Sequence, residues 1–340
     1  MMLSLVIPCY NEEGNVEKFF SETNRVFEGK VDEYEFVFVN DGSTDMTHKN
    51  LKKLYNENRD SNIQVLSFSR NFGKESAIYA GLTHANGDMV CLIDADLQQR
   101  PEVVLEMLEV MNSDPDLDCV TAYQDERKES AFMTKVKSAF YKVINKISDV
   151  DFVNGASDFR LMKRNMVDAI LSMSEFHRFS KGIFSYVGFN TKYIPYIVAE
   201  RESGESKWGF RKLFRYALEG IFAFSTKPLT ISTYVGFFSA VCSVIYLIVV
   251  IVQKLAFDIK VPGYATIVVL ILFIGGIQLF SLGILGEYIS KMYVQVKNRP
   301  VYILREHLSN TKLSSDALLS SDFNQVLNEI TPAEDEKTED

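Results

Sequence analysis

The sequence is poor in the residues that bind structural zinc or form disulfides. Four cysteines and four histidines are scattered over 340 residues, with no C-x-x-C pair and no H-x-x-x-H pair. This spacing excludes a zinc ribbon and a disulfide framework, and it favours a reducing compartment. No signal peptide is expected, because residues 1–9 are too short for its apolar region and lead directly into Tyr10-Asn11-Glu12.

The chain also lacks an excess of positive charge. It contains 36 Lys and Arg against 45 Asp and Glu, a formal net charge of −9. Nucleic acid is therefore not an expected partner. Because 47% of the residues are hydrophobic and 12% aromatic, a disordered or low-complexity chain is excluded as well.

Charge is absent from two long stretches, residues 229–252 and 263–286, each of 24 residues. A helix of that length reaches about 36 Å, enough to cross a hydrocarbon core of about 30 Å. A buried core helix explains one such run, but two neighbouring runs joined by a ten-residue connection that contains charged residues favour two transmembrane helices. Basic residues are concentrated outside the pair (Arg211, Lys212, Arg215 and Lys227 before it, and Lys291, Lys297, Arg299 and Arg305 after it), whereas the connection holds only Lys254 and Lys260. The distribution predicts a multi-pass membrane protein with both flanks and both termini in the cytoplasm.

Residues 1–200 alternate between strand-like and helix-like segments. The expected strands are Leu3–Cys9, Glu35–Val39, Ile63–Phe68, Met89–Ile93 and Asp118–Ala122, and the expected helices are Glu12–Phe27, Thr44–Asn58, Lys74–Ala85 and Pro101–Asn112. This alternation predicts a parallel α/β sheet. Polar clusters follow three of the strands, at 8–12, 40–43 and 94–96. Ligands bind such sheets at the carboxyl ends of the strands, so these clusters predict a site.

Three further segments have distinctive patterns. Residues 131–148 and 210–224 have apolar positions at helical spacing together with several basic residues, as helices in a membrane interface do. For 131–148 an ordinary half-buried helix is equally consistent. The segment from residue 309 to 340 ends in a strongly acidic run and is expected to be a disordered tail.

Oxygen ligands are placed at the end of one apolar strand. Asp94-Ala95-Asp96 is followed by Gln98, and carboxylate and amide oxygens are suited to Mg²⁺ or Mn²⁺. An Asp-x-Asp pair can also cap a helix, and Pro101 at a helix start keeps that alternative open.

Taken in order, the motifs resemble glycosyltransferase family 2, which has the GT-A fold, a Rossmann-like α/β architecture. The first three are Leu5-Val6-Ile7-Pro8-Cys9-Tyr10-Asn11-Glu12, Val39-Asn40-Asp41-Gly42-Ser43-Thr44-Asp45 and Asp94-Ala95-Asp96-Leu97-Gln98. Three more are Ser69-Arg70-Asn71-Phe72-Gly73-Lys74-Glu75, Ser157-Asp158-Phe159-Arg160 and Gly204-Glu205-Ser206-Lys207-Trp208. With the two spans, these resemble the polyprenyl-phosphate glycosyltransferases, which include bacterial undecaprenyl-phosphate glucosyltransferases and dolichol-phosphate mannose synthases. The resemblance covers about residues 1–305.

This resemblance implies a role for each matching residue. A nucleotide-sugar would be held by Pro8, Tyr10, Glu12, Val39, Asp41, Lys74, Asp94 and Ala95. Asp96 and Gln98 would bind the divalent ion. The phosphates, including that of the lipid acceptor, would be contacted by Arg127, Arg201 and Lys207. Asp158 and Arg160 would be the catalytic residues. The implied reaction transfers a hexose, glucose from UDP-glucose in the first instance, to undecaprenyl phosphate with inversion at the anomeric carbon. The resemblance further implies that the reaction takes place at the plasma membrane of a bacterium, in an enzyme that is a homo-oligomer such as a tetramer.

The role of Asp158 stays open at this point. The acceptor is a phosphate monoester with a second pKa of about 6, so it is largely ionised at neutral pH and needs little help from a general base. Asp158 is therefore equally consistent with a base and with a group that orients Arg160 or a neighbouring cation, or that stabilises positive charge on the sugar.

The chain departs from the family pattern at two places. Gln99-Arg100 stands where bacterial relatives usually have Asp-Pro, and Trp208 stands where many have Tyr. A processive polysaccharide synthase is disfavoured because no Q-x-x-R-W motif is present. A dolichol-phosphate-mannose-synthase-like use of GDP-mannose and a non-catalytic membrane scaffold remain as alternatives.

The predicted organisation is a catalytic domain at 1–208, a juxtamembrane helix at 209–228, the spans at 229–252 and 263–286, a returning segment at 287–308 and a tail at 309–340.

Overall fold

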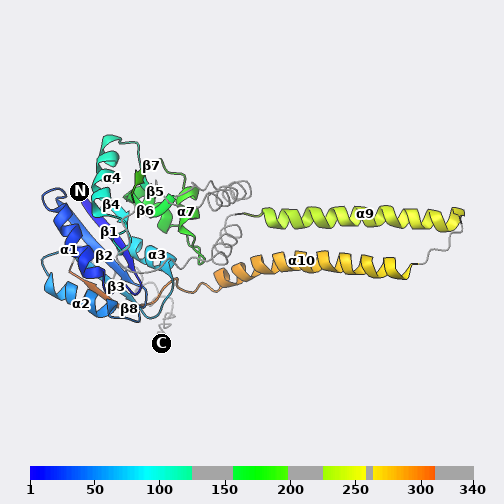
Figure 1. Cartoon of the computed structure of the whole chain (residues 1–340), viewed down its shortest axis with the longest axis horizontal. Helices are drawn as coiled ribbons and strands as arrows, with labels where there is room; N and C mark the ends of the chain where they lie inside the picture. Colours follow the sequence, from blue (N-terminus) through cyan, green and yellow to red (C-terminus); the bar gives the residue numbers. More distant parts are fainter. Residues whose placement is uncertain (125–155, 198–224, 258–262, 311–340) are drawn as a thin grey trace, which may run out of the picture.

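Eight strands form one mixed sheet in the computed structural model, which describes residues 1–124, 156–197, 225–257 and 263–310. The strand order is β7-β5-β6-β4-β1-β2-β3-β8. The strands are β1 (Met2–Cys9), β2 (Glu33–Asn40), β3 (Ile63–Phe68), β4 (Met89–Leu92), β5 (Cys119–Gln124), β6 (Ala156–Lys163), β7 (Thr191–Tyr196) and β8 (Leu304–Ser309). β1 lies at the centre, parallel to both β2 and β4, and this part of the sheet is visible in Figure 1.

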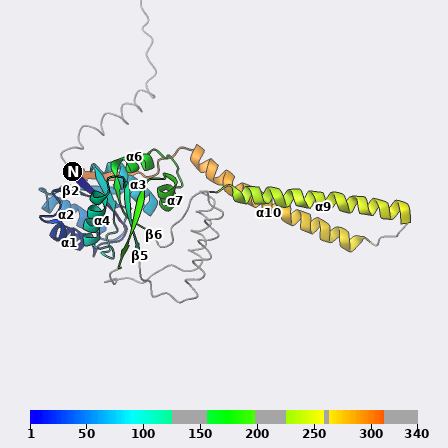
Figure 2. The same ribbon diagram turned by 90° about the horizontal axis from the view of Figure 1, so that it is seen from above.

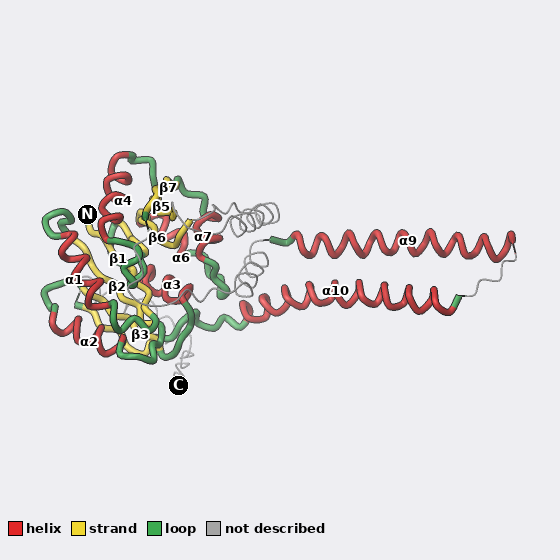
Figure 3. The backbone as a smooth tube through the Cα atoms, viewed as in Figure 1, coloured by secondary structure: helices red, strands yellow, loops and turns green. Residues whose placement is uncertain are grey.

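Helices cover both faces of the sheet (Figure 3). They are α1 (Val16–Phe27), α2 (Thr47–Glu57), α3 (Lys74–His84), α4 (Pro101–Ser113), α6 (Arg164–Leu171) and α7 (Ser180–Tyr186). Side chains of β1 alternate between the two faces, as in any strand: Leu5 and Ile7 pack with α1, α2 and α4, and Val6 packs with α3, α6 and α7. Both faces of the central strands are therefore buried, which explains why these strands are almost continuously apolar.

Helix α3 lies unusually close to the sheet. A Cβ atom placed on Gly81 would lie 2.2 Å from Val6 Cγ1, so only glycine permits this approach. The close packing fixes the first residues of α3 against the carboxyl ends of β1 and β2, where the polar clusters lie.

Most of the expected strands and helices of the first 124 residues are confirmed to within a few residues. The expectation of a parallel sheet is correct for β4-β1-β2-β3 but wrong for the sheet as a whole. β6 runs antiparallel to β4 and β5, and β8 runs antiparallel to β3. Both antiparallel strands come from distant parts of the chain, so local patterning did not indicate their direction.

Two long helices project from the domain as a hairpin (Figures 1 and 2). They are α9 (Lys227–Phe257) and α10 (Tyr264–Val296). Both are long and apolar enough to cross a membrane, and large apolar side chains such as Phe238 and Leu279 are about 70% exposed. Such a continuous apolar surface needs a lipid or protein environment, so the chain is membrane-associated. α10 continues ten residues beyond the expected end of the second span.

Two predicted helices, at 131–148 and 210–224, lie outside the described residues, and so does most of the juxtamembrane helix predicted at 209–228. The tail beyond residue 310 lies outside them as well. Between α10 and residue 310 the chain returns to the domain that contains the sheet. β8 pairs with β3, and Glu306 of β8 forms an ion pair with Lys52 of α2 at 2.6 Å. The sheet therefore holds the chain both before and after the hairpin.

His307 of β8 lies with its Nε2 3.3 Å from Oε1 of Gln64 in β3, and its surroundings predict that the attachment of β8 depends on pH. Burial, together with the neighbouring His84, lowers the pKa of His307 to about 4, whereas an unfolded histidine titrates near 6.5. The unfolded chain therefore binds the proton more tightly, and the free energy of unfolding falls as the pH drops from about 6.5 to about 4. The pKa values of His48 and His84 are lowered too, so they act in the same direction.

We expect His307→Gln to reduce this acid destabilisation without abolishing it. The measurement is the thermal midpoint of the detergent-solubilised full chain between pH 7.5 and pH 4.5. Replacement of the exposed His177 by Gln is the matched control. An unchanged pH dependence in His307→Gln would show that His307 is not the responsible group.

Candidate active site

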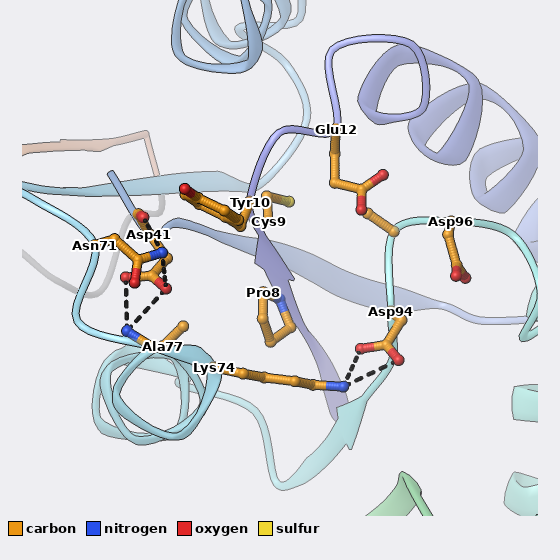
Figure 4. Close-up of a pocket in the computed structure, with 12 residues that line it drawn as sticks. Pro8, Cys9, Tyr10, Glu12, Asp41, Asn71, Lys74, Ala77, Asp94 and Asp96 are labelled. Atoms are coloured by element: carbon orange, nitrogen blue, oxygen red, sulfur yellow. Dashed lines mark hydrogen bonds and ion pairs between the residues drawn. The ribbon is translucent and has the colours of Figure 1, made fainter. Parts of the chain in front are cut away.

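A cavity of about 300 Å³ opens where β1, β2 and β4 end. Its walls come from the three polar clusters and from the start of α3 (Figure 4). The lining residues are Pro8, Cys9, Tyr10, Glu12, Asp41, Asn71, Gly73, Lys74, Ala77, Asp94, Ala95 and Asp96. The prediction from topology, that these clusters meet at one edge of the sheet, is therefore confirmed.

One end of the cavity is organised by the carboxylate of Asp41. It accepts hydrogen bonds from the backbone of Phe72 (2.6 Å) and Gly73 (3.0 Å) and from the side chain of Asn71 (3.0 Å). Burial raises the pKa of Asp41, and these hydrogen bonds partly offset the rise. Asp41 therefore holds the loop that leads into α3. Tyr10, 47% exposed, lies beside it in Figure 4.

Gly42 makes this arrangement possible. Its φ is +62°, and a Cβ atom there would lie 2.3 Å from the backbone carbon of Arg70. Both the left-handed conformation and the close approach require glycine. The Asp-Gly pair thus brings the loops after β2 and β3 together.

Lys74 joins the other end of the cavity to the neighbouring strand β6. Its ammonium lies 2.7 Å from Asp94 Oδ1 and 3.3 Å from Asp158 Oδ2. Burial lowers the pKa of Lys74, but the two carboxylates more than compensate and leave it above the usual value. Figure 4 shows the side chain extended across the cavity toward Asp94.

The ion pair with Lys74 decides the charge state of Asp158. Burial raises the pKa of this carboxyl, but Lys74, followed by Lys181 and Arg160, lowers it below the ordinary value. Asp158 is therefore an anion at neutral pH and a weak proton acceptor. Buried Arg160 donates instead to the backbone oxygens of Ser157 (3.0 Å) and Asp158 (3.4 Å), so among the described residues it is Lys74 that forms an ion pair with the Asp158 carboxylate.

Carboxylates gather at the Asp94 end of the cavity. The pKa of Glu12 is raised by burial and by the negative charges of Asp96 and Asp94. A hydrogen bond from Asn15 lowers this pKa but does not cancel the rise. A cation bound here would relieve this repulsion. Within the described residues, however, no three His, Cys, Asp or Glu side chains converge closely enough to hold a metal ion on their own. The donor set fits an ion that takes one or two carboxylates from the protein and the rest of its ligands from substrate phosphates, as Mg²⁺ often does.

Some residues assigned by resemblance lie outside the cavity wall. Gln98 is half-buried, and its backbone N–H donates to Asp96 Oδ1 at 3.1 Å. Val39 is fully buried in the core, so it can contact a nucleotide only through its backbone. Arg127, Arg201 and Lys207 lie outside the described residues.

Gln99, one of the departures from the family pattern, holds Asp94 at two points. Its side-chain oxygen accepts from the Asp94 backbone N–H at 2.9 Å, and its amide donates to Asp94 Oδ2 at 3.2 Å. Sequence reasoning treated this position only as a substitution. Its buried, hydrogen-bonded amide shows that it positions the carboxylate that Lys74 also contacts.

Known proteins match both parts of this chain. The family model for glycosyl transferase family 2 matches residues 4–171, and that for the GtrB C-terminal hairpin matches residues 227–292. The glycosyltransferase CsbB of Bacillus subtilis is 42% identical over 305 residues, which is 90% of this chain and 92% of CsbB. The SfII prophage-derived bactoprenol glucosyl transferase of Shigella flexneri is 42% identical over 306 residues, 90% of this chain and 98% of that protein.

Among solved structures, the mannosyltransferase PcManGT of Pyrobaculum calidifontis aligns with a TM-score of 0.45 at 16% identity, covering 84% of this chain and 86% of that one. The sequence relatives match this chain along nearly their whole length and show the family to which it belongs. Together with the sheet and the cavity, they confirm the predicted GT-A architecture: this chain belongs to glycosyltransferase family 2 and is a glycosyltransferase with a C-terminal helical hairpin.

Proposed function

We propose that this enzyme transfers glucose from UDP-glucose to undecaprenyl phosphate, the phosphate of bactoprenol, at a membrane surface. The observation that carries the proposal is the Lys74 bridge, which joins Asp94 in the cavity to Asp158 at its border. A donor in the cavity and an acceptor beside Asp158 would meet at this bridge. Relatives named bactoprenol glucosyl transferase, at 42% identity over nearly their whole length, support glucose as the sugar and bactoprenol as the carrier of the acceptor phosphate.

The two ends of the cavity suit the two ends of the donor. Tyr10 and Asp41 at one end offer an exposed ring and a polar loop for the base and ribose. Asp94 and Asp96 at the other end would face the diphosphate and the sugar (Figure 4). We place Asp96 and Gln98 as protein ligands of Mg²⁺ or Mn²⁺. When bound, the ion would neutralise the charge of the departing nucleoside diphosphate.

In the reaction an oxygen of the acceptor phosphate forms a bond to the anomeric carbon of glucose. The bond from that carbon to the β-phosphate oxygen breaks, and UDP leaves with the electron pair. Attack from the opposite face inverts the configuration, so an α-linked donor yields a β-linked lipid-phosphate sugar. Proximity supplies much of the acceleration, because a water-soluble donor and a lipid acceptor must be aligned.

Asp158 acts by its charge in this proposal. A carboxylate whose pKa is held below its ordinary value by Lys74 is poorly suited to accept a proton. It is well suited to stabilise positive charge that develops on the sugar and to hold Lys74 in place. Of the two roles left open by the sequence, we therefore favour the electrostatic and positioning role.

The hairpin would place this reaction at the headgroup level of the bilayer. We propose that α9 and α10 span the plasma membrane of a bacterium, with the catalytic domain and both termini in the cytoplasm, and that the enzyme is a homo-oligomer. Arg127, Arg201 and Lys207 are proposed to contact the phosphates of donor and acceptor.

The first prediction concerns the substrates. Membranes containing the enzyme should transfer radiolabel from UDP-glucose into the lipid phase when undecaprenyl phosphate is added, and EDTA should abolish this transfer. UDP-GlcNAc, UDP-galactose and GDP-mannose should label the lipid at least about tenfold more slowly, the scale of discrimination between similar substrates. A faster reaction with GDP-mannose would contradict the choice of donor, and no labelling of the lipid with any sugar would contradict undecaprenyl phosphate as the acceptor.

The second prediction concerns Asp158. Asp158→Asn should lower kcat by about 100-fold or more, as the loss of a preorganised charge does. Because Asp158 stays ionised above its lowered pKa, the rise in rate near pH 6 should belong to the acceptor phosphate. Pre-steady-state transfer rates between pH 5 and pH 9 should therefore rise through the same pH in wild type and variant. If the rise is lost in Asp158→Asn, the general-base role is correct.

The third prediction concerns Gln99. Gln99→Glu keeps the oxygen that accepts from the Asp94 backbone but removes the amide that donates to its carboxylate, and it adds a like charge. We expect kcat/KM for the donor to fall about tenfold, the cost of one hydrogen bond to a charged group. Gln124→Glu on β5, whose amide donates to Tyr196 Oη at 3.2 Å, is the control and should change this ratio little. Equal effects of the two variants would contradict the positioning role.

A further inference from the structure

A second lysine, Lys181, lies next to the Lys74–Asp158 pair but is not used by the reaction as described so far. It is the second residue of α7 and is half-buried. Its ammonium interacts electrostatically with Asp158, Arg160, Lys74 and Glu75. It forms no ion pair or hydrogen bond with any residue of the described ranges. A partly buried cation without a close anionic partner is costly to maintain, so the position points to an anion supplied from outside the chain.

Contacts on both sides of Lys181 fix its place in the molecule. The preceding residue, Ser180, donates to the carboxylate of Glu75 from its backbone N–H (2.8 Å) and from its hydroxyl. Glu75 follows Lys74 directly in α3. Three residues after Lys181, the ring of Phe184 lies under the guanidinium of Arg160 at 3.6 Å. α7 is therefore attached both to the helix that carries Lys74 and to the strand that carries Asp158.

The segment that leads into α7 is attached to the hairpin. Gln295, near the end of α10, accepts from the backbone of Phe176 at 2.8 Å and donates to the backbone oxygen of Ser174 at 2.9 Å. In Figures 1 and 2, α7 lies on the side of the domain from which the hairpin projects, and α1 and α2 lie on the far side. Lys181 thus belongs to the part of the domain nearest the membrane-associated helices.

Lys181 is also separate from the donor cavity. It does not belong to the residues that line the cavity, whereas Lys74 does. The Asp158 carboxylate interacts with both lysines. An anion beside Lys181 would therefore approach the Lys74–Asp158 pair from the membrane side rather than from the nucleotide side.

We propose that Lys181 binds the phosphate of the lipid acceptor and directs one of its oxygens toward the sugar held at Asp94. This assignment rests on the proposed function and deepens it by naming a residue for the acceptor. Lys181 would offset the negative charge of Asp158, which otherwise repels the incoming phosphate, and Gln295 would hold the lysine at a fixed position relative to the membrane helices.

The test compares ligand protection in wild type, Lys181→Met, Lys181→Arg and the control Lys192→Met, which removes an exposed lysine of β7. Each full-length protein in detergent is titrated separately with undecaprenyl phosphate, undecaprenol, inorganic phosphate and UDP, and the thermal midpoint is recorded. Transfer from UDP-glucose is measured in parallel, with each substrate varied in turn.

In wild type we expect undecaprenyl phosphate to raise the midpoint, and undecaprenol and inorganic phosphate to have little effect. Lys181→Met should raise the undecaprenyl phosphate concentration for half-maximal protection, and the acceptor KM, about tenfold or more. That is the effect of losing one charge-assisted contact. Its UDP protection and donor KM should stay within about twofold of wild type. Lys181→Arg and Lys192→Met should behave as wild type. If Lys181→Met folds poorly, Lys181→Gln takes its place. A tenfold rise in the acceptor KM of Lys181→Gln, together with a near-normal acceptor KM of Lys181→Arg, then supports the assignment.

The remaining outcomes overturn one proposal or the other. Unchanged acceptor protection in Lys181→Met, or a rise in donor KM alone, refutes the assignment of Lys181 while transfer by wild type still supports the proposed function. Equal protection by inorganic phosphate refutes the lipid as the source of the phosphate. Protection that depends on both the lipid phosphate and Lys181, without any transfer of glucose, supports Lys181 and refutes the proposed reaction.

Discussion

The active-site arrangement depends on one lysine held between two carboxylates. Asp94 comes from the end of β4 and Asp158 from β6, which runs antiparallel to it. Without a cation between them, these two anions would repel each other across neighbouring strands. Lys74 removes that repulsion, and its own position is set by the loop that Asp41 holds and by Gly81, which lets α3 lie against the sheet. Polar motifs far apart in sequence thus act together to place one ammonium group.

Local patterns were sufficient to predict the centre of the fold and the edge that carries the site. The apolar runs at 3–9 and 63–68 are strands because both of their faces are buried, and the polar residues that follow β1, β2 and β4 meet because parallel strands end at the same edge. Residue roles such as that of Lys74 came only from resemblance. Nothing in the spacing of Lys74 and Asp158, more than eighty positions apart, indicates that their side chains meet.

The features that the sequence did not indicate are all contacts between distant segments. Gln99 looked like a substitution in a loop, yet it holds Asp94 by two hydrogen bonds. Lys181 belongs to none of the motifs that the sequence offers. Its proposed role depends on Glu75 and Arg160, which fix α7 from two other elements. β8 pairs antiparallel with β3 because the chain leaves the domain, forms the hairpin and then returns to the sheet. Periodicity and motif spacing describe neighbours in sequence and carry no information of this kind.

The return of the chain also bears on how a lipid substrate can be handled by a water-soluble fold. A hairpin tied to the domain by one flexible end would leave the active site at a variable height above the bilayer. Here α10 contacts the segment before α7 through Gln295, its Tyr288 hydroxyl donates to the backbone oxygen of Ser225, two residues before α9, and β8 then joins the sheet. The contacts of Gln295 and β8 attach the α10 end of the hairpin to the domain, and the bond from Tyr288 ties the start of the hairpin to α10. α7, which carries Lys181, lies on the side of the domain from which the hairpin projects, where the proposed acceptor assignment requires it.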